Sequence, residues 1–543
     1  MRSSSITAAL TCFVWICASA SAQDITVSRV GGTDDFNYHG QTGGIAAYNF
    51  GTTSCNPSQV EVNWTTEDHP VIGQNFYRLK QGRFVQLGQS WLKHGFCAVN
   101  EFSCGACITT SCDTLGIGCA DTYSSGLNDG SGGGPKYQVN ATTGVHLDPH
   151  ANPAGPSTLR GRLQVPVVDI DPAQNVGALW FAEGQYVSKH EALAGNAGNS
   201  VSWRKLRVDS VNSVHSDGPT VMEQAATYAW RSQDSQVTVV DVTNDDEGGV
   251  GVHGHFSVAY RVTDLGGGLW RYNYVVENIS STQSAGTWSV PAPQDVSLSN
   301  FFFRDVGYHS GEPYDGSDWT ASHAGGQLTW STTQTHAQNA DANAIRWGTL
   351  YSFGFDANSQ PTPGVGVIGL FAPGSGNVVT VPVEGPTGGG GGNWSYCFGD
   401  SGNCPCQNHG APGHGCFNGS FASGAQLNDS GSPSISADTL VLNSTNSTPG
   451  APGLYFEGST RIAGGLGMPF GDGLRCVGGN IQRLQLRSAD GSGSASTTLA
   501  ISVRGNASAG TTLYYQFWYR DPHLSPCLGN FNLTNGRAVT WTP

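Results

Sequence analysis

Apolar and polar residues alternate along much of the chain with the period of two that is typical of β-strands. The clearest case is the pair of runs 76–79 and 84–87, which flank Gln81-Gly82. A Gly-containing dipeptide between two alternating runs predicts a tight hairpin turn. We expect this hairpin to lead into the cysteine-rich loop that ends at Tyr123.

The same pattern recurs in short segments separated by turn residues, which indicates antiparallel β-sandwiches. A second hairpin is expected from Phe256–Val262 and Trp270–Glu277, and one short helix near 189–194. Further strands are expected at 44–50, 60–64, 179–187, 237–242, 296–303, 328–330, 347–355, 365–371, 439–442, 481–487, 497–503 and 511–519.

The fold class is therefore all-β, with several domains. An apolar run followed by small residues predicts a secretory signal peptide at 1–22, so the mature protein is expected to be secreted. We then expect a disulfide-rich β domain at 23–164 and a β-sandwich domain at 165–384. A Gly-rich linker at 385–393 precedes a disulfide-containing β domain at 394–543.

The cysteines beyond the signal peptide form two even sets, with none between them. An exported protein favours disulfides, so each set is expected to form three bridges within its own domain, with the pairing left open. The alternative for Cys104-Gly-Ala-Cys107 is a zinc or redox pair. The sets are Cys55, Cys97, Cys104, Cys107, Cys112 and Cys119, and Cys397, Cys404, Cys406, Cys416, Cys476 and Cys527.

The net charge of the chain disfavours some classes of binding partner. The chain has 25 Lys and Arg against 40 Asp and Glu, a formal net charge of −15. This acidity argues against nucleic acid and anionic membrane surfaces as partners. Beyond the leader, no stretch approaches the roughly 20 apolar residues of a membrane span. We therefore expect no membrane span.

Two motifs carry the candidate chemistry. Lys93-His-Gly-Phe-Cys97 is followed by Cys119-Ala-Asp-Thr-Tyr123, and His69 lies upstream. This segment resembles the cofactor-forming segment of lysyl oxidases. The resemblance implies that Lys93 and Tyr123 are the precursors of lysine tyrosylquinone and that His69 is a copper ligand. It departs from the family at the two other copper positions, which here are Thr65 and Glu67.

The implied activity is oxidation of primary amines, either small amines or protein lysines, to aldehydes. Copper on imidazoles can oxidise a tyrosine ring with O2, and a desolvated lysine amine can then add to that ring. Such a cross-link requires Lys93 and Tyr123 to lie side by side. The alternative is structural: Lys93 reaches solvent along its stem, and Tyr123 packs against a disulfide.

One histidine cannot hold copper tightly, so further ligands must be found. His253-Gly-His255 is the best supply, because alternation along a strand points both rings to one face. We expect this pair to fold against His69, with His94 and His39 as weaker candidates. The alternative is two solvent-facing histidines at a strand end.

An acidic loop in the second domain offers oxygen ligands for calcium. Asp305, Glu312, Asp315 and Asp318 are spaced irregularly and do not fit an EF-hand. The alternative is a solvated acidic turn.

The rival function is a non-catalytic extracellular binding or adhesion protein that recognises extracellular matrix or a surface glycan. The segments around Tyr272-Asn-Tyr274 and Cys397–Asn418 resemble β-rich modules of secreted bacterial proteins of unknown function. The chain contains no Gly-x-Ser-x-Gly elbow, P-loop, dinucleotide fingerprint or His-Glu-x-x-His motif.

The Gly-rich linker makes a testable prediction. Because Gly388–Gly392 has no side chains to pack, brief native proteolysis should cut near Gly390 and release two folded fragments. Mass spectrometry and melting of the separated fragments measure this. Resistance to cleavage at that position would contradict it.

Overall fold

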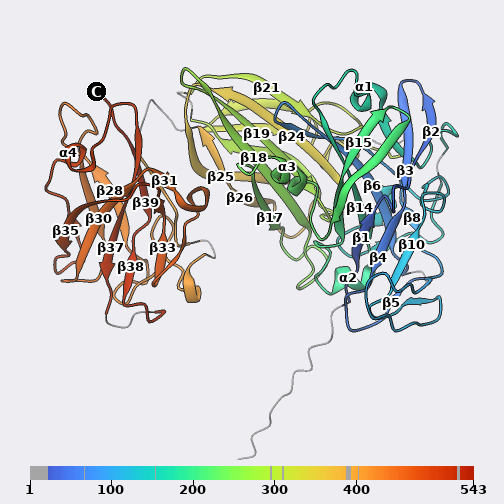
Figure 1. Cartoon of the computed structure of the whole chain (residues 1–543), viewed down its shortest axis with the longest axis horizontal. Coiled ribbons are helices and arrows are strands. Elements are labelled where there is room, and N and C mark those ends of the chain that lie inside the picture. Colours follow the sequence, from blue (N-terminus) through green and yellow to red (C-terminus); the bar gives the residue numbers. More distant parts are fainter. Residues whose placement is uncertain are drawn as a thin grey trace, which may run out of the picture.

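The structure is a computed structural model that describes residues 23–65, 68–152, 154–293, 296–307, 311–386, 393–400, 403–522 and 526–543. It confirms the all-β class, since the chain is built from antiparallel sheets (Figure 1). The described α-helices are short: α1 (Val167–Ile170), α2 (Lys189–Leu193), α3 (Thr227–Gln233) and α4 (Ile501–Gly505). Helix α2 confirms the helix expected near 189–194.

The N-terminal unit is organised by a nine-stranded sheet. Its order is β16-β15-β14-β6-β7-β13-β3-β2, and β8 also pairs with β6. The strands are β2 (Phe36–Thr42), β3 (Ile45–Phe50), β6 (Val71–Lys80), β7 (Arg83–Gln89), β8 (Lys93–His94), β13 (Leu163–Pro166), β14 (Leu179–Val187), β15 (Val201–Ser210) and β16 (Ser213–Val221).

The boundary expected between residues 164 and 165 is wrong. β13 spans it, and β14 pairs with β6 along its whole length, from Leu179 opposite Leu79 to Val187 opposite Val71. The buried Phe181 and Ala182 pack on both faces of this sheet, as a central strand requires. The first unit therefore continues to β16.

The hairpin at Gln81-Gly82 is confirmed. Lys80 pairs with Arg83, and the two residues between them have φ of 52° and 72°. Positive φ at both central positions is the geometry of a type I′ turn, whose twist matches the flanking strands. The turn thus sets the register that places β6 beside β7.

A smaller sheet, β1-β4-β10, packs on the first sheet and completes the core of this unit. Its strands are β1 (Thr26–Val30), β4 (Thr52–Cys55) and β10 (Ala120–Tyr123). Trp64 and Tyr123 are both buried in this core. Two-stranded ribbons border it: β5 (Val62–Asn63) with β9 (Thr114–Leu115), and β11 (Val139–Asn140) with β12 (Val145–His146).

The middle unit is a sandwich of two five-stranded sheets around an aromatic core that includes Tyr274, Trp288, Trp330 and Phe353. The hairpin β18–β19 confirms the one expected here. One sheet has the order β17 (Thr238–Thr243), β18 (His255–Gly266), β19 (Leu269–Asn278), β24 (Thr349–Ala357), β21 (Leu298–Arg304). The other has the order β22 (Thr320–Ala324), β23 (Gln327–Ser331), β20 (Ala285–Pro291), β25 (Pro361–Leu370), β26 (Val378–Pro386).

The first two units share a packed interface. Phe84 stacks on Trp230 of α3 with ring centroids 6.3 Å apart, and Phe181 packs beside them. Within this interface the Tyr77 hydroxyl lies 2.8 Å from Glu183 Oε1 and 3.1 Å from Glu277 Oε1. All three of these polar residues are buried.

Backbone amides complete this carboxylate pair. Ala226 N donates to Glu183 and Thr227 N donates to Glu277, both at the start of α3. Burial, and then the neighbouring Glu183 carboxylate, raise the pKa of Glu277 well above its ordinary value of 4.5. Two carboxylates this close retain a proton, because they cannot both ionise at low cost.

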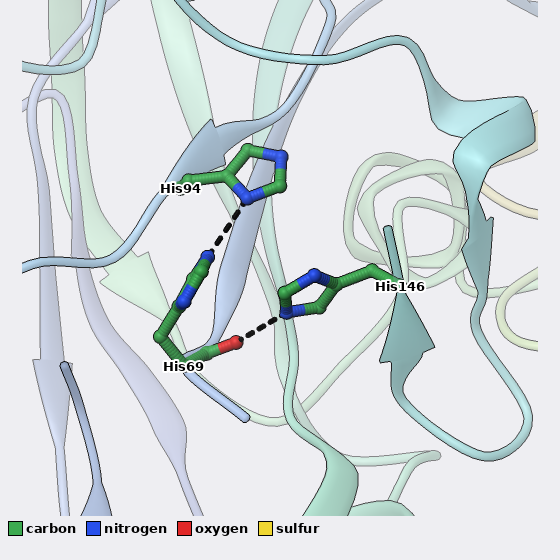
Figure 2. Close-up of side chains that lie close together, drawn as sticks. All are labelled: His69, His94 and His146. Atoms are coloured by element: carbon green, nitrogen blue, oxygen red, sulfur yellow. Dashed lines mark hydrogen bonds between the residues drawn. The ribbon is translucent and has the colours of Figure 1, made fainter. Parts of the chain in front are cut away.

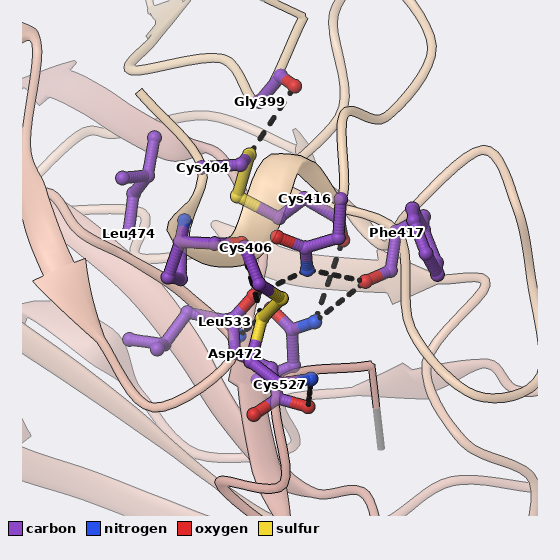
Figure 3. The surroundings of a disulfide bond; sticks show 12 residues. Gly399, Cys404, Cys406, Cys416, Phe417, Asp472, Leu474, Cys527 and Leu533 are labelled. Atoms are coloured by element: carbon purple, nitrogen blue, oxygen red, sulfur yellow. Dashed lines mark hydrogen bonds between the residues drawn. A yellow bond between two sulfur atoms is a disulfide. The ribbon is translucent and has the colours of Figure 1, made fainter. Parts of the chain in front are cut away.

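The C-terminal unit has its own core and three disulfides, Cys397–Cys476, Cys404–Cys416 and Cys406–Cys527. Figure 3 shows the last two beside Asp472, whose carboxylate accepts from Cys527 N (3.2 Å). The second cysteine set therefore forms the three expected bridges. Of the linker expected at 385–393, Gly385 and Pro386 belong to the end of β26, and residues 387–392, which include the expected cleavage site, lie outside the described part of the chain.

The C-terminal sheets have the orders β27-β39-β37-β30-β35, with β38 beside β37, and β28-β29-β36. Their strands, with two small ribbons, are β27 (Trp394–Tyr396), β28 (Gln426–Ser430), β29 (Val441–Thr445), β30 (Pro452–Gly458), β31 (Thr460–Arg461), β32 (Met468–Phe470), β33 (Gly473–Arg475), β34 (Val477–Gly478), β35 (Gln482–Ser488), β36 (Ala495–Ser496), β37 (Thr512–Arg520), β38 (Phe531–Leu533) and β39 (Gly536–Thr540).

The carboxylate pair predicts a pH dependence of stability. Because the folded state holds a proton that the unfolded chain releases, the free energy of unfolding should fall as pH rises above 4.5. One proton gives a slope of up to about 1.4 kcal/mol per pH unit. Glu277→Gln should flatten this slope in denaturant titrations between pH 5 and 8.

The exposed Glu61→Gln is the matched control and should keep the slope of the unmodified protein. Equal slopes in the unmodified protein and Glu277→Gln would show that the pair does not hold a shared proton.

Candidate functional site

The structure brings Lys93 and Tyr123 together. Lys93 begins β8, Tyr123 ends β10, and Lys93 Nζ lies 5.5 Å from the centroid of the Tyr123 ring. The same amine lies 4.4 Å from the ring of Phe96. The side-by-side placement that a cross-link requires is therefore present.

The Tyr123 hydroxyl is fixed by three hydrogen bonds. It donates to Phe96 O (2.7 Å) and accepts from Phe96 N (3.0 Å) and Trp64 Nε1 (3.1 Å). Burial, and then Asp121, raise the pKa of Tyr123 above its ordinary value. The phenol is thus neutral and held in one orientation.

Two carboxylates bear on the pair. Asp121 accepts from Val99 N (2.7 Å) and Trp64 Nε1 (2.9 Å), and burial raises the pKa of Asp121 to about 6.

Lys93 Nζ donates to His94 O (2.6 Å). Burial lowers the pKa of Lys93 to about 8, although Asp129 and Asp121 favour its charged form. A lysine amine in this environment has substantial nucleophilic character.

Three imidazoles form a compact cluster next to this pair in the chain. His69, His94 and His146 each offer a nitrogen, and these atoms lie within 4.8 Å of one another. Figure 2 shows the three rings converging from separate segments: His69 before β6, His94 on β8 and His146 on β12. Such a set is the one group of three or more metal-ligand side chains found among the described residues.

The cluster is held by its own contacts. His69 Nε2 and His94 Nδ1 lie 2.8 Å apart, so they share one proton, and His146 Nε2 donates to His69 O (3.0 Å). Burial lowers the pKa of His94 to about 2, with His150 and His69 the next largest causes. The His94 imidazole is therefore neutral, which is the form that ligates metals.

A fourth imidazole adjoins the cluster. The rings of His94 and His150 are stacked, with centroids 4.0 Å apart and planes 19° from parallel. Gly134 makes this approach possible: a Cβ there would lie 3.1 Å from His150 Cβ and 3.3 Å from His94 Nε2.

The expectation that His253 and His255 complete the site at His69 is corrected. His253 Nδ1 lies 3.3 Å from Asp246 Oδ1, and His255 lines a separate cavity beside β17. Among the described residues, the partners of His69 are His94 and His146 instead. The sequence did not single out His146, and its only signal was a second histidine four positions on, in Val145-His-Leu-Asp-Pro-His150.

Successive side chains of a strand point to opposite faces. Lys93 and His94 are successive residues of β8, so we infer that the Lys93–Tyr123 pair and the imidazoles lie on its two sides. The site thus consists of two adjoining compartments joined by one peptide unit.

Among the described residues, Asp305, Glu312, Asp315 and Asp318 do not form a metal-ligand cluster. Glu312 accepts from Lys136 N and Tyr137 N, and Asp305 accepts from the side chain of Asn343. These carboxylates instead hold backbone and side chains of neighbouring segments.

The expectation of three bridges in the first cysteine set is wrong in this structure. The bridges are Cys55–Cys104 and Cys107–Cys119, so the zinc or redox reading of Cys104 and Cys107 does not hold. Cys97 and Cys112 are free and exposed. They are neighbours, since a hydrogen bond to Cys112 is the largest of the causes that raise the pKa of Cys97 to about 11.

Comparisons with known proteins give little information about the family or function of this chain. No family model matches the chain, and no curated protein matches it, so the resemblance to lysyl oxidases rests on the quoted residues alone. The chain is similar to a solved "Biofilm associated protein - BSP domain", with 8% identity, coverage of 94% of this chain and 82% of that one, and a TM-score of 0.14. It is also similar to a "Biofilm associated protein - B domain", with 9% identity, coverage of 65% and 86%, and a TM-score of 0.12.

TM-scores this low carry no argument about fold or function. The five disulfides of the described residues do bear on location, because such bonds persist in oxidising compartments. They indicate an extracellular or surface protein. None of the helices in the described part of the chain is long and apolar enough to cross a membrane.

The adjacent thiols generate a prediction. Mild oxidation with diamide should join Cys97 to Cys112, because the two thiols are already in contact. Alkylation of the unfolded, non-reduced protein should label both cysteines before oxidation and neither afterwards. Peptide mapping of the product measures the link. Oxidation that joins either cysteine to any other residue would contradict this geometry, and Cys112→Ser should abolish the link.

Proposed function

We propose that this protein is a copper-dependent oxidase of primary amines whose organic cofactor forms from Lys93 and Tyr123. The observation that carries the proposal is the 5.5 Å separation between the Lys93 amine and the Tyr123 ring. Both residues are positioned by strands, and the chain contains few lysines to occupy such a place. The cluster of three imidazoles adds a second observation. It includes His94, the residue that follows Lys93.

The residues of the cluster suit copper. Imidazole nitrogens are preferred ligands of Cu2+, and a site of this kind needs about three nitrogen donors. His69, His94 and His146 would hold the ion, and the contact between His69 Nε2 and His94 Nδ1 would have to give up its shared proton to make both nitrogens available. When bound, copper supplies one-electron chemistry with O2.

The chain's own residues prepare the cofactor precursors. Phe96 holds the Tyr123 hydroxyl through both its backbone groups, and its ring covers the Lys93 amine. Burial favours the neutral amine of Lys93, which is the form that adds to an oxidised ring. Asp121, beside the phenol, is placed to accept a proton.

The overall reaction converts a primary amine, O2 and water into an aldehyde, ammonia and hydrogen peroxide. A quinone formed from Lys93 and Tyr123 would supply a carbonyl group that reacts with primary amines, so secondary and tertiary amines would not be substrates. Small amines and protein lysines both present the required group.

A second candidate function is binding of an extracellular glycan. Phe470, Phe531 and Trp518 form a row on the C-terminal unit, with ring centroids 5.0 Å and 5.6 Å apart. Phe470 is 43% exposed. A row of partly exposed aromatic rings offers faces on which sugar rings can stack.

The deciding experiment is to purify the protein with copper and to measure bound metal, quinone absorbance and staining by redox cycling. The unmodified protein should give all three signals. His94→Ala with His146→Ala should weaken copper binding at least ~10-fold and abolish the quinone. Lys93→Met should keep the copper and lose the quinone.

His253→Ala with His255→Ala is the matched control and should retain both copper and quinone. Stoichiometric copper without any quinone in the unmodified protein would overturn the oxidase. The glycan-binding role would then be tested by Phe470→Ala in pull-down on extracellular polysaccharide.

A further inference from the structure

A cavity of about 600 Å³ lies between the N-terminal unit and the sandwich, away from the residues proposed for catalysis. Its walls come from the loop 195–199 after α2, the loop before α3 and the adjoining ends of β17 and β18. This volume is within the range of small-molecule sites.

Hydrogen-bond acceptors dominate the polar part of this cavity. Asp241 Oδ2 accepts from the Tyr228 hydroxyl (2.6 Å), and Oδ1 accepts from Ser257 Oγ (2.6 Å). Each oxygen keeps a further lone pair, because a carboxylate has about four acceptor sites. The two hydroxyls therefore fix the carboxylate without saturating it.

Two further acceptors have no partner among the described residues. Asn199 Oδ1 is buried and accepts no hydrogen bond. The carboxylate of Glu223, also in the wall, is not a member of any ion pair in the described part of the chain. Of the two, Asn199 Oδ1 is buried and the carboxylate of Glu223 is exposed. A buried acceptor left unpaired is costly, so Asn199 Oδ1 points to a donor supplied by a ligand.

The charge of the cavity is one-sided. Its described lining includes Asp241 and Glu223 but neither lysine nor arginine. The remaining titratable imidazole is that of His255, whose pKa is lowered by burial and by His253, so it does not balance the carboxylates. The His255 ring packs directly against Gly198, because a Cβ at this position would lie only 2.7 Å from His255 Nδ1.

We propose that this cavity binds a small organic cation that carries a primary ammonium group. The ammonium supplies three donors, which match the open lone pairs of Asp241, Glu223 and Asn199. The half-buried Tyr228 ring in the wall adds a face for cation–π contact. This inference does not rest on the proposed oxidase, because none of its residues belongs to that site.

The test uses the full chain in a Lys93→Met background, in which no quinone can capture an amine. Isothermal titration with 1,5-diaminopentane should show saturable binding, whereas the neutral 1,5-pentanediol and the anionic glutarate should not bind. Asp241→Asn and Glu223→Gln should each weaken diamine binding at least ~10-fold, since each removes a charge and keeps the shape.

Asp264→Asn, in the exposed β18–β19 turn, is the matched control and should bind like its parent. Thermal melting verifies that each variant is folded, and Glu223 is exposed, so Glu223→Gln remains informative if Asp241→Asn unfolds. Equal binding of the diol and the diamine, unchanged affinity in both carboxylate variants, or no diamine binding would overturn the proposal. Loss of quinone in the oxidase experiment would leave it standing.

Discussion

The buried contact of Tyr77 with Glu183 and Glu277 is the constraint on which the arrangement of the first two units depends. Glu183 belongs to the N-terminal sheet and Glu277 to the sandwich, so one phenol hydroxyl and one retained proton join two separate β structures. Lys136 extends the network, since its buried amine donates to Asn75 Oδ1 (3.4 Å) and Asn75 Nδ2 donates to Glu183 Oε1 (2.9 Å). Apolar packing around Phe84 and Trp230 excludes water and makes any unmatched polar group there costly.

Local features were predictable from the sequence. The hairpin at Gln81-Gly82 follows from turn chemistry, and the proximity of Lys93 and Tyr123 was expected from the resemblance of two motifs to the lysyl oxidase segment. The partners of His69 were not predictable, because a strand-like His-x-His pattern indicates that two rings share a face without telling which surface that face meets. His146 reaches the cluster from a two-residue ribbon that carries no periodic signal.

The unit boundary failed for a related reason. The local sequence around residue 164 says nothing about sheet pairing, and β14 returns to β6 across a long separation in sequence. The number of cysteines does not determine their pairing either. An even number in the first set predicted that all six form disulfides, whereas the structure leaves Cys97 and Cys112 side by side as thiols. Long-range pairing depends on the complete packing of the chain, and no local pattern encodes it.

The shortness of β8 couples the two compartments of the site. Because Lys93 and His94 are consecutive, the proposed precursor of the cofactor and one member of the imidazole cluster share one peptide bond and one pairing with β6. A one-residue slip of β8 against β6 would move both side chains to the opposite face of the strand at once. Any change in the pairing of β8 with β6 therefore acts on the Lys93–Tyr123 contact and on the imidazole cluster together, although the two draw on distant parts of the chain.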